Sequence, residues 1–135
     1  MDHSPYLNDA LTRQDSMLEC AMQTLDEHKD KFDAIVCTGI SGLLVGPTLA
    51  YMLSKRLAIV RKDCDRNNHA TERVESGLNK KDRWIFVDDL IASGETIRHV
   101  ERTMNKLIGF EGKMAGHYLY NSDCWAGGQW MGGEW

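Results

Sequence analysis

The sequence predicts an α/β domain in which a single parallel β-sheet is flanked by helices. Short apolar runs typical of buried strands occur at residues 32–37, 57–60, 84–87 and 113–120. They alternate with longer stretches in which apolar residues recur every three or four positions, as they do in amphipathic helices. A chain of 135 residues is long enough for one domain with its own core.

Composition excludes several classes of protein. The formal net charge of -4 argues against a nucleic-acid-binding surface, which is usually basic. No apolar run is long enough to span a membrane, and the first residues do not have the pattern of a signal peptide. The cysteines are far apart and form no Cys-x-x-Cys pair, so a zinc site is disfavoured. We therefore expect a cytoplasmic protein with reduced thiols, and we expect the apolar patterns around Cys20 and Cys37 to bury both of them.

The N-terminal half predicts a helix, a strand and a second helix. Residues 7–31 carry one apolar stripe, and their last residues are crowded with charges. After the strand at 32–37, residues 38–42 form a tight glycine-rich turn, which is a possible anion site but a weak signal alone. A helix then covers residues 43–55, with Pro47 near its first turn, where proline is tolerated.

The second strand, residues 57–60, is followed by basic and then by polar residues. Arg61 and Lys62 leave its carboxyl end, where they either reach an anionic ligand or are ordinary surface charges. Residues 63–81 are polar, and so long a polar loop in a compact domain is usually functional or disordered. Towards the C-terminus we expect a helix at 97–108, a strand at 113–120, and a tail at 121–135.

The stretch that carries chemistry is residues 84–96, WIFVDDLIASGET. A buried strand ends in Asp88 and Asp89, and a turn of small residues then leads into a helix. The backbone N–H groups of such a turn, together with the positive end of the helix dipole, favour a phosphate. The stretch thus predicts an anion cradle beside a carboxylate pair, as a sugar phosphate would require. The alternative is a buried strand that ends in a solvated acidic turn.

This stretch resembles the phosphoribosyl-diphosphate signature of the type I phosphoribosyltransferases, and the order of elements from Phe32 to Tyr120 is similar to their adenine and orotate branches. The resemblance implies that Asp88 and Asp89 hold the ribose hydroxyls and act on Mg2+ through those hydroxyls or through water. It implies that the loop after them wraps the 5′-phosphate; the loop residues are Ala92, Ser93, Gly94, Glu95 and Thr96.

The resemblance also assigns the leaving diphosphate to the glycine-rich turn and the second strand's carboxyl end; these residues are Thr38, Gly39, Ile40, Ser41, Gly42, Arg61 and Lys62. Unlike the adenine enzymes, this turn has no basic residue. The polar segment 63–81 is similar to the family's mobile catalytic loop, with Arg66, His69 and Arg73 as candidates to meet the diphosphate. His69 is equally well explained as an exposed loop histidine.

The implied activity is transfer of a 5-phosphoribosyl group from phosphoribosyl diphosphate to a nucleobase, with Mg2+ and release of diphosphate, by a homodimer. Ala92 stands where enzymes acting on 6-oxopurines usually have aspartate, which favours adenine or orotate. The hood over the base is minimal, with only residues 1–31 and the glycine- and tryptophan-rich tail to supply it. A non-catalytic nucleotide-binding module is therefore the alternative hypothesis. A phosphatase-like enzyme would need a nucleophilic aspartate after an early strand, and this chain has none in the turn at Gly39.

Overall fold

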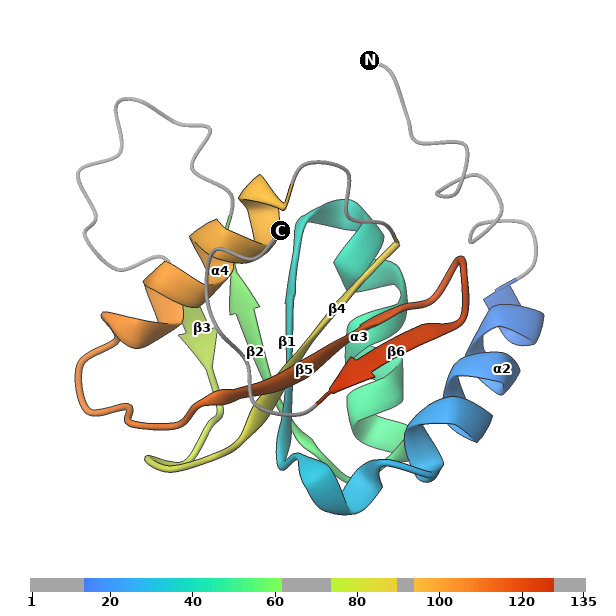
Figure 1. Cartoon of the computed structure of the whole chain (residues 1–135), viewed down its shortest axis with the longest axis horizontal. Coiled ribbons are helices and arrows are strands. Elements are labelled where there is room, and N and C mark those ends of the chain that lie inside the picture. Colours follow the sequence, from blue (N-terminus) through green and yellow to red (C-terminus); the bar gives the residue numbers. More distant parts are fainter. Residues whose placement is uncertain (1–13, 62–73, 90–93, 128–135) are drawn as a thin grey trace.

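The computed structural model describes residues 14–61, 74–89 and 94–127. They form a six-stranded sheet with the strand order β3-β2-β1-β4-β5-β6 (Figure 1). The four inner strands are parallel: β1 (Ala34–Thr38), β2 (Arg56–Val60), β4 (Trp84–Asp88) and β5 (Met114–Leu119). The predicted α/β class and the four predicted strands are confirmed.

Helices cover both faces of this sheet. In the described part of the chain they are α2 (Gln14–Asp26) and α3 (Gly39–Met52) on one face and α4 (Glu95–Asn105) on the other. The 3-10 turn η1 (Lys29–Lys31) lies between α2 and β1. Ile35, Ile85 and Val87 pack on the face covered by α2 and α3, whereas Val36 and Phe86 pack on the face covered by α4. Alternate residues of β1 and β4 thus enter two separate cores, which is why both strands are buried along their whole length and are apolar up to their last residue.

The two edge strands were not predicted. β3 (Val74–Ser76) lies inside the segment expected to be a polar loop and pairs antiparallel with β2. Val74 is buried and the next two residues are exposed, which suits a short edge strand. β6 (Cys124–Gly127) pairs antiparallel with β5, so the beginning of the expected tail is part of the sheet. Trp130 and Trp135 lie outside the described residues.

Several helix boundaries differ from the prediction: α2 ends at Asp26 and not at residue 31, and α3 ends at Met52 and not at residue 55. α3 begins at Gly39 and not at residue 43, because Gly39 takes a φ of 68° and turns the chain immediately after β1. The expected glycine-rich turn is therefore the first turn of the helix, and Pro47 lies well inside it. α4 ends at Asn105, so Ile108, expected on its buried stripe, is 95 % exposed.

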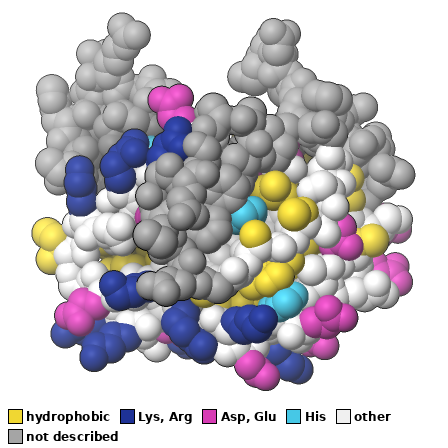
Figure 2. All heavy atoms as spheres, in the orientation of Figure 1, with side chains coloured by type: hydrophobic (Ala, Val, Ile, Leu, Met, Phe, Trp, Pro, Cys, Tyr) yellow, Lys and Arg dark blue, Asp and Glu magenta, His cyan; other side chains and the backbone are white. Residues whose placement is uncertain are grey.

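Charged side chains of both signs lie on the surface. Figure 2 shows Lys and Arg over α4 and along the lower edge, with acidic side chains among them, and further acidic side chains towards α2. Cys37 is buried, but Cys20 is exposed on α2, contrary to the prediction. Among the described residues, no helix has both the length and the apolar character needed to cross a membrane.

Candidate active site

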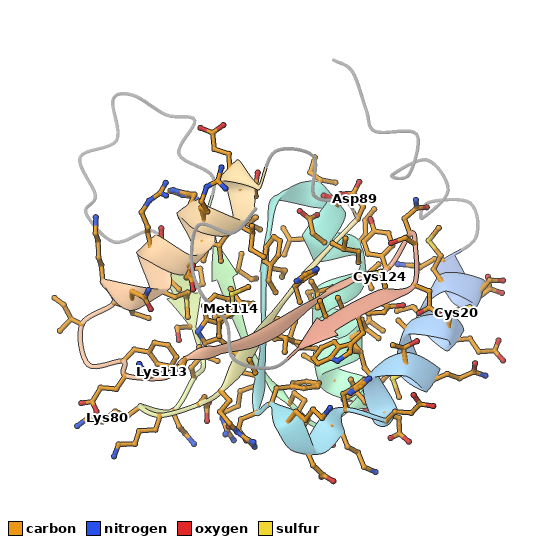
Figure 3. All side chains as sticks on the ribbon, in the orientation of Figure 1. Cys20, Lys80, Asp89, Lys113, Met114 and Cys124 are labelled. Atoms are coloured by element: carbon orange, nitrogen blue, oxygen red, sulfur yellow. The ribbon has the colours of Figure 1, made fainter. Side chains whose placement is uncertain are left out.

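Asp88 and Asp89 stand at the carboxyl end of β4, between β1 and β5. Their position is that of a ligand site in a parallel sheet, where binding residues follow the strand ends. Both residues are only 7 % exposed. Figure 3 shows Asp89 beside the beginning of α3, so this helix and the acid pair share one edge of the sheet.

Asp88 is held by two donors. The Ser41 hydroxyl donates to Oδ1 at 2.9 Å, and the Asp89 backbone N–H donates to the same oxygen at 2.8 Å. Burial raises the pKa of Asp88 to about 7, and the Asp89 carboxylate adds to the rise, while the two hydrogen bonds oppose it. Two acidic groups are thus buried together at the point where a hydroxylated or cationic ligand would relieve their mutual repulsion.

Glycines bring α3 close enough for this contact. A Cβ added to Gly42 would lie 2.9 Å from Cys37 Cβ and 3.4 Å from the Val87 carbonyl oxygen. A Cβ added to Gly46 would lie 2.9 Å from Cys37 Sγ. The first two turns of α3 therefore sit directly on β1 and on the end of β4, and any larger residue at these positions would push the helix away.

The predicted diphosphate residues are divided between the helix start and the neighbouring strand. The Thr38 hydroxyl donates to the Val60 carbonyl oxygen at 2.5 Å, so this side chain ties β1 to β2. Ile40 is 58 % exposed at the first turn of α3. Arg61 follows β2 and is exposed, whereas Lys62 lies outside the described residues, as do Arg66, His69 and Arg73.

The predicted 5′-phosphate loop is described from Gly94 onwards; Ala92 and Ser93 lie outside the described residues. Gly94 is buried and caps α4 with a φ of 80°, a left-handed conformation that glycine adopts without strain. Glu95 and Thr96 form the first turn of α4 and are exposed. The Glu95 carboxylate thus lies at the N-terminal end of α4, where the helix dipole favours negative charge.

Sequence reasoning missed Tyr120 as a site residue. Its backbone N–H donates to the Asp88 carbonyl oxygen at 3.1 Å, so it lies directly beside the acid pair. Tyr120 is 2 % exposed, and its hydroxyl has no hydrogen-bond partner among the described residues. Burial raises its pKa, and the charges of Asp89 and Asp88 raise it further. Only the pairing of β5 with β4 reveals this neighbourhood, because the two residues are far apart in sequence.

Two carboxylates are a partial metal site. Within the described ranges, no group of three or more His, Cys, Asp or Glu side chains is arranged to hold a metal ion. Mg2+ commonly uses one or two carboxylates and takes its other ligands from water and substrate oxygens. The acid pair fits that mode of binding and does not fit a metal held by protein ligands alone.

Comparison with known families identifies the family of the chain. The sequence model of a protein family, the phosphoribosyl transferase domain, matches residues 9–107 of the chain. The chain belongs to this family. The match includes β1, α3, β2, β4 and α4, and therefore both the acid pair and the predicted phosphate loop.

Relatives with curated names are similar over part of their length. The chain is 30 % identical over 112 residues to the adenine phosphoribosyltransferase of Bifidobacterium animalis, covering 70 % of this chain and 58 % of the relative. It is 32 % identical over 91 residues to the adenine phosphoribosyltransferase of Thermotoga petrophila, covering 58 % of this chain and 54 % of that one. The chain thus spans little more than half the length of these relatives.

Solved structures support the same fold. The adenine phosphoribosyltransferase of Thermoanaerobacter pseudethanolicus superposes with a TM-score of 0.62 at 22 % identity, covering 82 % of this chain and 70 % of that one. The orotate phosphoribosyltransferase of Aeropyrum pernix has a TM-score of 0.61 at 24 % identity, covering 78 % of this chain and 58 % of that one. At such identities the likeness speaks for the fold alone.

Proposed function

We propose that the protein transfers a 5-phosphoribosyl group from phosphoribosyl diphosphate to a nucleobase and releases diphosphate. The observation that carries the proposal is the buried pair of Asp88 and Asp89, which precedes the turn into α4 inside the family match. A buried acid pair suits a ligand that brings hydroxyls and a developing positive charge. Both are features of a ribosyl group that is losing its leaving group.

The described residues suggest a division of labour. Asp88 and Asp89 would accept hydrogen bonds from the ribose hydroxyls. The 5′-phosphate would lie at the start of α4, where Gly94 allows the backbone to come close and Ser93, Thr96 and the N–H groups of Ala92 and Glu95 would surround it. The diphosphate would lie at the start of α3, opposite the phosphate, and residues 38–42 would bind it.

Basic residues would complete the diphosphate site. Arg61 is exposed at the end of β2 and would reach the diphosphate together with Lys62. In the polar segment, Arg66, His69 and Arg73 would close over it and exclude water while the sugar carries positive charge. In the transfer, the bond from the sugar's anomeric carbon to the diphosphate oxygen breaks and a bond to a ring nitrogen forms.

Mg2+ is part of the proposal. The acid pair would hold it through the ribose hydroxyls or through water. When bound, the ion would neutralise charge on the departing diphosphate. The two carboxylates supply the oxygen ligands that this ion prefers, and the substrate supplies others.

Adenine is the first acceptor to test, because several of the similar curated proteins are adenine phosphoribosyltransferases. A similar protein of Methanopyrus kandleri is named a hypoxanthine/guanine phosphoribosyltransferase, so 6-oxopurines belong in the same test. Orotate belongs there too, given the fold shared with the orotate enzyme. We also propose a homodimer, which sedimentation would test.

The deciding experiment follows diphosphate release from phosphoribosyl diphosphate with Mg2+ and each base in turn, with the Asp88→Asn/Asp89→Asn double variant as control. We expect release with one base and none without a base or with the variant. Calorimetric binding of phosphoribosyl diphosphate without release with any base would overturn the transferase and identify a binding module. Absence of both binding and release would overturn the assignment of the site.

A further inference from the structure

The contact between Ser41 and Asp88 joins the two halves of the proposed site. Ser41 belongs to the first turn of α3, and Asp88 ends β4, 47 positions further along the chain. We propose that Ser41 is a positioning residue that fixes the orientation of Asp88 towards the ribose, and so couples the diphosphate turn to the ribose site. This inference rests on the proposed function, and it assigns Ser41 a role different from direct contact with diphosphate.

The element that presents Ser41 is closely packed. Gly42, the next residue, leaves no room for a side chain, because an added Cβ would lie 2.9 Å from Cys37 Cβ of β1 and 3.4 Å from the Val87 carbonyl oxygen of β4. The Thr38 hydroxyl fixes the end of β1 to β2 just before the helix begins. Ser41 is therefore presented to Asp88 by a turn that has little room to shift, which is what a positioning group requires.

The surroundings of Asp88 make the Ser41 hydroxyl important. Asp89, Cys37 and Tyr120 lie close enough to Asp88 for their charges to interact with its carboxylate, and none of them carries positive charge. Within the described residues this carboxylate accepts hydrogen bonds from the Ser41 hydroxyl and from the Asp89 N–H, and both end on Oδ1. Loss of the Ser41 hydroxyl would leave a buried carboxylate with one donor instead of two, so its orientation would be less well defined.

The same geometry limits what else Ser41 can do. A hydroxyl has one proton to donate, and here it donates to Asp88. In this arrangement, the side chain cannot also donate to an anion at the start of α3. The turn would therefore meet diphosphate through backbone N–H groups, while the Ser41 side chain serves the acid pair. Removal of the hydroxyl should weaken ribose binding and leave diphosphate binding unchanged.

The different roles of the Ser41 side chain and the backbone can be tested with two separate ligands. The affinity of the full chain for each is measured by calorimetry in the presence of Mg2+. Ribose 5-phosphate carries the ribose hydroxyls without a diphosphate, and inorganic diphosphate carries no ribose. We expect Ser41→Ala to weaken ribose 5-phosphate binding roughly fivefold, the effect of one hydrogen bond, with diphosphate affinity unchanged. Ser41→Thr keeps the hydroxyl and should restore binding. Thr103→Ala removes a hydroxyl bonded within α4 and is the matched control.

A second measurement does not depend on either ligand. Because the Asp89 N–H donates to the oxygen that Ser41 holds, its hydrogen exchange in the free protein should accelerate in Ser41→Ala and return to the wild-type rate in Ser41→Thr. The control variant should leave this exchange unchanged.

The outcomes separate the alternatives. Loss of diphosphate binding in Ser41→Ala would make Ser41 a direct ligand and overturn the inference. If Ser41→Ala lowers the affinity for both ligands equally and Ser41→Thr does not restore it, Ser41 has a structural role, and the inference is also overturned. Unchanged ribose 5-phosphate binding and Asp89 exchange would overturn it while the proposed function stands. If wild-type protein binds neither ligand, the proposed function fails, and the inference fails with it.

Discussion

The hydroxyl of Thr24 in α2 donates a 2.6 Å hydrogen bond to Oδ1 of Asp123, a residue 99 positions further along the chain. The same oxygen accepts the Tyr118 hydroxyl of β5 at 2.7 Å. Asp123 lies in the turn between β5 and β6 with a φ of 47°, a left-handed conformation that aspartate and asparagine tolerate better than most residues. One carboxylate thus ties α2 to the hairpin formed by β5 and β6.

We predict that Asp123→Ala lowers the free energy of unfolding by about 2 kcal/mol, because it leaves the buried Tyr118 hydroxyl without an acceptor and disfavours the turn. Asp123→Asn keeps an acceptor oxygen and tolerates the same φ, so it should lose distinctly less. Urea unfolding of the two variants measures the difference. Equal losses of unfolding free energy in the two variants would show that the hydrogen bonds to the Asp123 side-chain oxygen do not stabilise the protein.

The central strands could be predicted because each of them is a continuous apolar run that can be recognised from its own sequence. β1 and β4 have helices on both faces, so their residues form continuous apolar runs. The edge strands β3 and β6 are short and only partly buried, and their sequences lack such a run. β6 also depends on pairing with β5, and its Trp125 stacks on His28 with ring centroids 4.5 Å apart, a contact between distant segments.

The candidate site was predictable where a motif is contiguous. Asp88, Asp89 and Gly94 belong to one stretch of sequence, and the end of β4 and the start of α4 present them at the carboxyl edge of the sheet. The partners of these residues come from elsewhere: Ser41 arrives through the close packing of α3, and Tyr120 through the pairing of β5 with β4. Such neighbours depend on strand order and register, which no local pattern specifies.

The acid pair leads to a prediction that separates binding from folding. Replacement of both Asp88 and Asp89 by asparagine should abolish measurable affinity for phosphoribosyl diphosphate while the thermal midpoint stays the same or rises. An asparagine in place of Asp88 still offers an oxygen to Ser41 and to the backbone N–H of the next residue, and the cost of burying two negative charges disappears. Calorimetry and thermal unfolding of the same preparation measure both. Undiminished affinity would count against the assignment of the ribose site.

Because His117 is buried, we predict that the folded protein loses stability in mild acid. Burial lowers its pKa to about 4, from an ordinary value of 6.5. As pH falls from 6.5 to 4, this residue binds a proton in the unfolded chain but not in the folded one, so its contribution to stability is lost across that window. His117→Gln, which cannot titrate, should show a shallower decline in the free energy of unfolding than wild type between about pH 7 and about pH 4.5. Parallel declines would show that His117 titrates alike in both states.

The start of α4 gives the sharpest test of the phosphate cradle. Gly94 is buried at a φ of 80°, where a β-branched side chain is strongly disfavoured. Gly94→Val should therefore abolish calorimetric binding of ribose 5-phosphate, because both the backbone conformation and the close approach of the chain to the phosphate are lost. Asparagine tolerates positive φ, so Gly94→Asn isolates the effect of added bulk and should bind more weakly than wild type but measurably. Circular dichroism of each variant verifies that the sheet and α4 are formed. Wild-type affinity in a folded Gly94→Val protein would exclude this loop as the phosphate site.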